Sequence, residues 1–433
     1  MNIHFRLRHL DVRLRPVLRP LQAIACQAAL LLTLAQPSLA QSIDPQLRQD
    51  FLSDPLTETP RDPLLPSPVV ERPLSPLERS RLSQALDELN REAQQRLAVG
   101  QVDAAFEIWR RELRLRRALG RSAELAAISR VGPIAWQQER PVEVQLLTLR
   151  LREIVTAAQP GADEDRNEID EDEDVLAPPL NEAQLETVAE TFRVLRAVDD
   201  AIAAYEQLAQ LAADRGDGLA QRRRLNILAQ IHLDWFRFAD AAEVYRRLLA
   251  DARIQNSLEQ QEFYLIQLVY SYQQGDSLTN AIRAQTDLLA VYQRQGRIAQ
   301  YPPLELAIAR NYRDLNRPND AIAYYRAAYV AAQQLQQFSF ASQVLQDLGQ
   351  LYATQGQTEE ALLAYNLLVK AEQQSYNTYG EMNAYDAIGQ LQRSQGNSFE
   401  ALQAFERGLV LANRLSYRQD YFTEQIEQVN QQL

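Results

Sequence analysis

The sequence predicts an all-α fold, an α-solenoid of stacked helix pairs, and three observations carry this prediction. An alanine followed by Ile, Ala or Leu recurs six times at a step of forty residues, at positions 201, 241, 281, 321, 361 and 401. An aromatic side chain follows each of these anchor alanines by one helical turn, except after Ala281, where Gln285 stands. Only 14 glycines occur in 433 residues. A fixed step of this kind is typical of repeat arrays, in which each unit contacts only its neighbours.

Residues 1–40 have the pattern of a cleavable signal peptide. Five arginines precede the apolar stretch from Leu21 to Ala35, and Ser38-Leu39-Ala40 fits a cleavage site. This pattern predicts a periplasmic protein with no stable membrane insertion after cleavage. An uncleaved anchor is the alternative, but the apolar stretch is short for a membrane span. The only cysteine, Cys26, lies inside this stretch, so the processed chain has no disulfides or thiolate metal sites.

Residues 41–75 contain seven prolines and predict an extended linker with polyproline character. Such a linker either spaces the array from its point of export or lies over the first repeat. Its apolar stretch, residues 64–70, is also a candidate docking strip for a groove.

The array itself is predicted over residues 76–415 as about eight repeats. Ser75, Pro76 and Glu78 open a helix that runs to about Ala98. A second helix begins near Val102 after a turn at Gly100. Residues 416–433 predict a C-terminal capping helix, because they mix amides and acids with a few apolar side chains.

An acidic insertion over residues 160–179 interrupts the array, and its charge density predicts a disordered segment. Three interpretations are open: a solvated loop, a diffuse acidic patch that binds a divalent cation weakly, and a calcium loop. Glu168 stands where a calcium loop needs glycine, which disfavours the third. The candidate metal ligands are Asp163, Asp165, Asp170, Asp172 and Asp174.

Charge and composition restrict the class of function. The formal net charge is -12, so nucleic acid is not an expected partner. His232 is the only histidine beyond the signal region, and it lies at a core position of the repeat. Because no nucleophile, metal cluster or phosphate loop is visible, we expect no enzyme activity.

The repeat resembles the tetratricopeptide repeat. In its clearest unit the pattern is Leu345, Leu348-Gly349, Tyr352, Gly356, Ala361, Tyr365, Leu368. The step is forty instead of thirty-four residues, which adds nearly one turn to each helix. The resemblance implies a right-handed superhelix that binds a protein or peptide partner.

In this family the exposed positions of the first helices form the concave wall. Carried over by register, the candidate protein-binding groove residues are Asn226, Gln230, Tyr270, Gln273, Arg310, Arg313, Gln346, Gln350, Asp386, Gln390 and Arg393. The amides could bond to a peptide backbone, and the two arginines to a carboxylate. The alternative is that these side chains are only solvated.

A narrower resemblance is to the PratA family of cyanobacterial periplasmic processing-associated tetratricopeptide repeat factors, on the segments 61–66 and 72–78. It implies a role in photosystem II assembly, with binding of the C-terminal tail of a membrane protein precursor. It also implies weak Mn²⁺ binding through oxygen ligands, with no other cofactor required. The alternative function is a structural scaffold of an envelope protein complex without metal.

Overall fold

The computed structural model describes residues 43–57, 60–66, 73–159 and 178–431. Within these ranges all regular elements are helical, with eighteen α-helices and two short 3-10 helices, η1 (Arg117–Leu119) and η2 (Ile298–Gln300). The predicted all-α solenoid of sequential helix pairs is confirmed. None of the described helices is long and apolar enough to cross a membrane. The predicted signal peptide and residues 160–177 of the acidic insertion lie outside the described residues.

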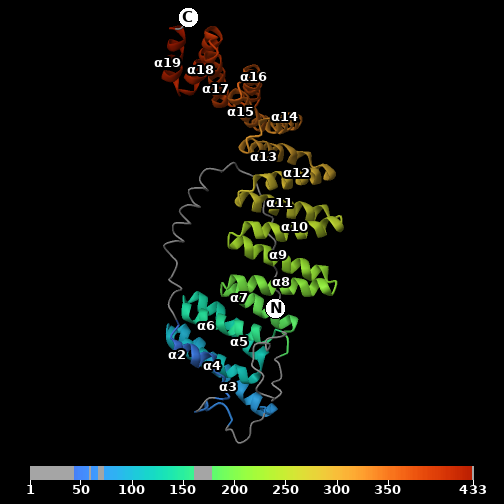
Figure 1. Cartoon of the computed structure of the whole chain (residues 1–433). Helices are drawn as coiled ribbons and strands as arrows, with labels where there is room; N and C mark the ends of the chain where they lie inside the picture. Colours follow the sequence, from blue (N-terminus) through green and yellow to red (C-terminus); the bar gives the residue numbers. More distant parts are fainter. Residues whose placement is uncertain (1–42, 58–59, 67–72, 160–177, 432–433) are drawn as a thin grey trace. The chain divides into compact units, whose positions relative to one another are not determined.

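The chain divides into two compact units, residues 1–204 and 205–433, and the boundary falls within α8. In the first unit, consecutive helices of the array run antiparallel (Figure 1). Its helices are α2 (Pro45–Leu52), α3 (Pro76–Ala98), α4 (Val102–Arg116), α5 (Arg121–Gln137), α6 (Pro141–Ala157), α7 (Glu182–Val194) and the start of α8 (Val198–Asp214).

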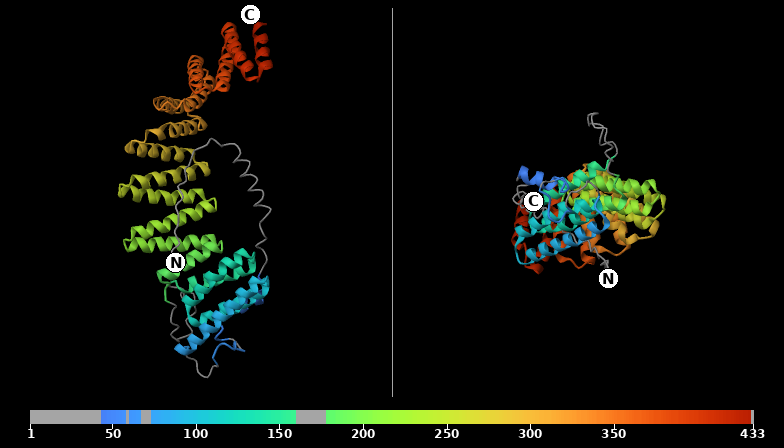
Figure 2. Two further views of the ribbon diagram at one scale, coloured as in Figure 1. Left: turned by 180° about the vertical axis from the view of Figure 1, so that it is seen from behind. Right: turned by 90° about the horizontal axis from the view of Figure 1, so that it is seen from below.

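The second unit continues the same alternation of antiparallel helices, which Figure 2 shows from behind. Its helices after α8 are α9 (Gly218–Asp234), α10 (Phe238–Ile254), α11 (Leu258–Gln274), α12 (Leu278–Gln295), α13 (Tyr301–Asp314), α14 (Pro318–Gln334), α15 (Phe338–Thr354), α16 (Thr358–Gln374), α17 (Thr378–Ser394), α18 (Ser398–Leu415) and α19 (Gln419–Asn430).

The forty-residue period comes from helix length and turn geometry. Most helices of unit 2 have 17 residues. A left-handed residue terminates a helix every twenty residues, at Arg196, Gly216, Phe236, Asn256, Asp276, Gly296, Asn316, Gln336, Gly356, Tyr376, Gly396 and Ser416. Two such helices with two three-residue connections account for the period. Because only four of these twelve residues are glycine, the turns are barely visible in the sequence.

The repeated alanine and aromatic side chains form the core. All six anchor alanines are fully buried. A Cβ added at Gly349 would lie 2.5 Å from Tyr365 Cε1, and one at Gly389 would lie 2.6 Å from Phe405 Cε1. The small residue on each of these first helices therefore makes room for the aromatic ring of its partner helix, which explains why the two recur together.

The N-terminal segment differs from the predicted extended linker. Residues 45–52 form α2, in which Phe51 is buried, and Leu65 packs against Leu82 and Leu86 of α3. Arg117 donates hydrogen bonds to the carbonyls of residues 51, 52 and 53, which lack partners within the helix. Burial lowers the pKa of Arg117 to about 10, so it remains charged at neutral pH. The described part of the linker thus packs against the array.

The junction of α12 and α13 is polar where other repeats are apolar. Gln285 occupies the aromatic position, and its Oε1 accepts a hydrogen bond of 2.8 Å from Asn311 Nδ2. Both side chains are buried. Glu305 stands where Leu225, Leu265 and Leu345 stand in other repeats, is only 9 % exposed, and its Oε2 has no hydrogen-bond partner among the described residues. Burial raises the pKa of the Glu305 carboxyl.

Candidate functional site

The candidate binding surface is the first-helix face of unit 2, defined by the eleven groove residues predicted on α9, α11, α13, α15 and α17. The structure exposes six of them, Gln230, Tyr270, Gln273, Arg313, Gln346 and Gln350. The other five are half-buried: Asn226, Arg310, Asp386, Gln390 and Arg393. None is fully buried, but many contact side chains of the array itself.

On α9 the two amides already donate hydrogen bonds within the unit. Asn226 Nδ2 donates to the Arg222 carbonyl at 2.8 Å and to the Tyr264 hydroxyl of α11 at 3.3 Å. Gln230 Nε2 donates to Asp234 Oδ1 at 2.6 Å. A peptide backbone that binds these two amides would compete with the hydrogen bonds that they already make within the chain.

The two arginines of α13 both pair with carboxylates of the chain. Arg310 Nε lies 2.7 Å from Asp347 Oδ2, which joins α13 to α15. Arg313 pairs with its neighbour Asp314 at 2.9 Å. A C-terminal carboxylate of a partner would therefore have to displace an aspartate at either arginine. This lowers the gain that we expect from such a contact.

The three predicted groove residues of α17 are instead covered by the C-terminal helix α19. Asp386 pairs with Arg418 at 2.8 Å and accepts a hydrogen bond from the Tyr421 hydroxyl. Gln390 and Arg393 both donate to Gln425 of α19. The register does place these side chains outward. They nevertheless do not line an open groove, because α19 packs where the first helix of another repeat would follow.

Sequence reasoning placed Tyr270 on this face but missed the apolar side chains around it. Phe263, Ile266 and Tyr270 follow one face of α11, and each is about half exposed. The Phe238 ring lies 6.3 Å from the Tyr270 ring in an edge-to-face arrangement, and Phe236 lies 6.1 Å from Phe238 in the same way. We call these five side chains the α11 ridge. The signal was available, because positions 263 and 266 share the helical face of Tyr270.

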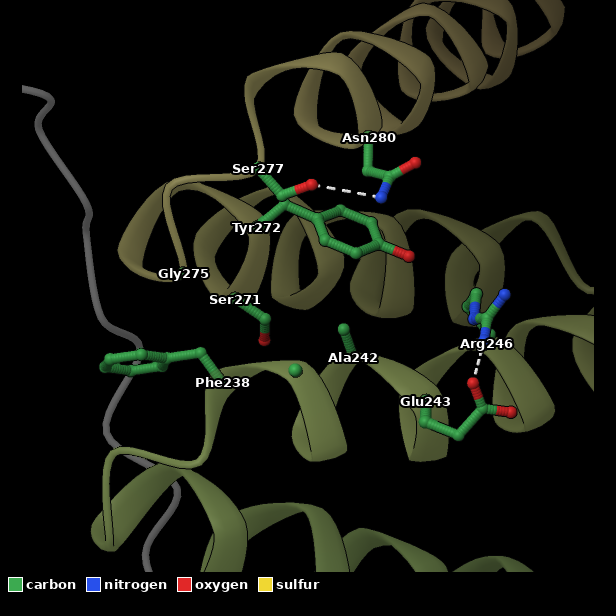
Figure 3. Close-up of a pocket in the computed structure, with 10 residues that line it drawn as sticks. Phe238, Ala242, Glu243, Arg246, Ser271, Tyr272, Gly275, Ser277 and Asn280 are labelled. Atoms are coloured by element: carbon green, nitrogen blue, oxygen red, sulfur yellow. Dashed lines mark hydrogen bonds and ion pairs between the residues drawn. The ribbon is translucent and has the colours of Figure 1, made fainter.

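A pocket of about 260 Å³ lies between α10 and the connection from α11 to α12. Figure 3 shows Phe238 at one end and the ion pair of Arg246 with Glu243 at the other. Ser277, whose hydroxyl accepts a hydrogen bond of 3.0 Å from Asn280, lines the opposite wall. The walls offer an aromatic edge, neutral polar groups and an ion pair, but no arrangement of nucleophile and base.

His232 lies in the core, as its position in the repeat predicts. It is buried, and its Nδ1 lies 3.9 Å from Asp240 Oδ2 without a hydrogen-bond partner among the described residues. Burial lowers the pKa of the imidazole. Of the four tyrosines at core positions of the repeat, Tyr325, Tyr352 and Tyr365 are buried as well, whereas Tyr312 is only partly buried.

The candidate metal ligands Asp163, Asp165, Asp170, Asp172 and Asp174 fall outside the described residues. Within the described ranges, no three His, Cys, Asp or Glu side chains gather closely enough to hold a metal ion. The manganese prediction is not tested by this geometry.

One protein-family model agrees with the helix-pair architecture. The tetratricopeptide repeat model matches residues 342–375, which span most of α15 and all of α16. No curated protein matches the chain.

Among solved structures, BtubC (BKLC) from P. vanneervenii is 16% identical, with 51% of this chain and 92% of that chain covered and a TM-score of 0.34. MamA is 16% identical over 44% of this chain and 96% of that one, with a TM-score of 0.32. The apo form of RapI is 11% identical over 68% and 99%, with a TM-score of 0.28. The repeat match covers the helix pair of α15 and α16, and the other described helices follow one another in sequential pairs as well.

Proposed function

We propose that this protein is a non-enzymatic adaptor or assembly factor that binds a segment of a partner protein on the first-helix face of unit 2. Tetratricopeptide repeat proteins are generally non-enzymatic and bind protein partners. The observation that carries the proposal is that each first helix has one buried side and one exposed side. On these helices, core residues such as Leu268 and Leu348 are buried against neighbouring helices. Tyr270, Gln346 and Gln350 stay exposed on the other side, although stacking does not use them.

A binding screen on the intact processed chain tests this function. Immobilised protein is presented with a random peptide library, and enriched peptides are measured by fluorescence anisotropy. Substitution of Gln346 and Gln350 by Ala should weaken enriched peptides that contact α15, while a matched pair on the second helix, Glu359→Ala with Glu360→Ala, should not. If no peptide is enriched, the proposed function fails.

The partner and compartment are proposed on the resemblance to the PratA family. We propose a periplasmic location and, as ligand, the C-terminal tail of a membrane protein precursor in photosystem II biogenesis. A tail peptide with a free carboxylate should bind more tightly than its amidated form, and Arg310→Ala with Arg313→Ala should remove the difference. Equal affinity of the two peptides would discard the carboxylate contact. Cell fractionation tests the location.

Weak Mn²⁺ binding is proposed on the same resemblance and on the acidic composition. Calorimetric titration with Mn²⁺, Ca²⁺ and Mg²⁺ should show saturation with manganese at sub-millimolar concentration. Replacement of Asp170, Asp172 and Asp174 by Asn should weaken it if the insertion holds the ion. Without saturable binding, only the adaptor function remains.

A structural scaffold of an envelope complex is the second candidate, and a second exposed aromatic cluster favours it. Tyr376 is 94 % exposed, and the rings of Tyr379 and Tyr417 lie 5.9 Å apart at neighbouring turns. Two separate interaction surfaces suit a scaffold. Crosslinking in intact cells separates the candidates, because one dominant membrane-protein partner supports the adaptor and a large envelope assembly supports the scaffold.

A further inference from the structure

The α11 ridge is an apolar surface that the fold does not require. At the three register positions of Phe263, Ile266 and Tyr270, the first helix α9 carries Arg223, Asn226 and Gln230. At the same positions α15 carries Gln343, Gln346 and Gln350. On α13, Leu306 stands at the position of Ile266 and is buried in the core. Since α9 and α15 stack in the same array with polar side chains there, the exposed Phe263, Ile266 and Tyr270 are not needed for stacking.

Phe236 adds a second observation. It is 71 % exposed and adopts the left-handed backbone conformation, with φ of 57°. This conformation is unfavourable for a bulky side chain, and none of the other turns after a first helix carries an aromatic residue there, since they use Arg196, Asp276, Asn316, Gly356 and Gly396. An exposed aromatic residue in a strained turn position, stacked edge to face on Phe238, is a feature that stability alone does not select.

The charge of α11 defines the chemistry of the ligand. From Phe263 to Gln274 the helix contains no charged residue. Glu262, just before this stretch, is paired with Arg297 at 2.6 Å, and the arginines of α13 are paired with aspartates. A charged segment laid on the ridge would lose its hydration without gaining a counter-charge from residues 263–274 of α11, whereas an apolar one would gain the benefit of burial.

We propose that the α11 ridge is the anchoring subsite of the first-helix face, and that it takes an uncharged partner segment with at least two large apolar side chains. This inference rests on the proposed protein-binding function and specifies the segment that is bound. Phe263, Ile266 and Tyr270 span about 10 Å along the helix, since seven residues rise at 1.5 Å each. Phe238 and Phe236 extend the ridge beyond Tyr270, because the Phe238 ring contacts Tyr270 and the Phe236 ring contacts Phe238. Glutamines at 267, 273 and 274 border the ridge.

The array supplies its own matched variant for the test. The triple substitution Phe263→Gln, Ile266→Gln and Tyr270→Gln copies onto α11 the side chains that α15 carries at the same positions. We expect this variant to fold, because α15 stacks in the same array with these three glutamines. Wild type and this variant, both as the full processed chain, are screened with one random peptide library. Sedimentation velocity of both proteins is measured in parallel, and circular dichroism verifies the helix content.

We expect wild type to enrich uncharged peptides with two or more Phe, Leu, Ile, Trp or Tyr residues, and the triple variant to bind them roughly 30-fold more weakly, as for an interface hot spot. Glu359→Ala with Glu360→Ala on the second helix α16 should leave this binding unchanged, and Arg310→Ala with Arg313→Ala is measured in parallel. Three results would overturn the inference: enrichment of acidic peptides that depends on the arginines and not on the ridge, equal binding by the triple variant, or self-association of wild type that the triple variant abolishes. The first two leave the proposed function standing, while enrichment of no peptide at all rejects that function itself.

Discussion

Replacement of Glu305 by Leu should stabilise the second unit, because Glu305 is a buried carboxyl group at a position where four other repeats carry leucine. Its Oε2 lacks a hydrogen-bond partner among the described residues. Removing a buried unsatisfied polar atom gains about 1–3 kcal/mol. Burying a leucine side chain in its place gains about 1.5–3 kcal/mol. We expect a net gain of about 2–4 kcal/mol, since the new side chain fills a site shaped for another one.

The effect should depend on pH in a defined direction. Burial raises the pKa of Glu305 above its unfolded value, so the folded state carries no ionisation penalty at low pH. As the pH rises through the folded pKa, the folded state has to ionise a buried carboxyl and loses stability. The advantage of Glu305→Leu over wild type should therefore be larger at pH 8 than at pH 4.5. Glu305→Gln, which removes only the charge, should show the same pH trend with a smaller gain.

Hydrogen exchange of the α13 amides and calorimetric unfolding at the two pH values are suitable assays, because repeat arrays open locally as well as globally. For a unit of this size, each kcal/mol corresponds to about 2–4 °C in Tm. The reciprocal change, Leu345→Glu in α15, should destabilise by a similar amount. A Glu305→Leu variant that is no more stable than wild type at pH 8, or whose gain is the same at both pH values, would refute the reasoning.

Three other perturbations test separate features of the fold. Arg117→Ala should accelerate hydrogen exchange of the last amides of α2 by about 100-fold, since three carbonyl contacts are lost, whereas Arg48→Ala on the exposed side should not. His232→Tyr, which copies Tyr272 of the next repeat, should flatten the pH dependence of urea unfolding. The lowered pKa of His232 means that the unfolded chain gains a proton which the folded chain does not, so wild type loses stability as the pH falls below about 6.5. Gly349→Ala should destabilise by about 1–3 kcal/mol through its clash with Tyr365, and Tyr365→Leu in the same chain should recover part of that loss in a denaturant titration.

Most of the fold could be predicted from the sequence, because a repeat array is held together by local contacts that recur. The anchor alanines and their aromatic partners fix which faces are buried, and the step of forty fixes the length of the helix pair. Ser75 with Glu78 marked the start of α3, and the structure confirms the capping box there. The positions of the turns were harder to predict, because residues such as Gln336 and Arg196 adopt the left-handed conformation for which glycine is the usual sequence signal.

The candidate site was predicted only in part. Register correctly placed Gln346 and Gln350 outward, but it carries no information on contacts between side chains of different repeats. Arg310 is paired with Asp347 of the next first helix, and Arg393 is held by α19. Neither contact has a sequence signature, because each depends on how far apart the helices stack.

By itself, the sequence determined the class of the protein and the side of each helix that is buried, since both follow from a period that stacking imposes on every repeat. The tertiary structure alone decided which outward side chains remain available. It covers the end of the first-helix face with α19, neutralises the arginines of α13, folds part of the proline-rich linker onto the first unit, and leaves the α11 ridge exposed. These outcomes depend on distances between elements far apart in the chain, which local patterns do not encode.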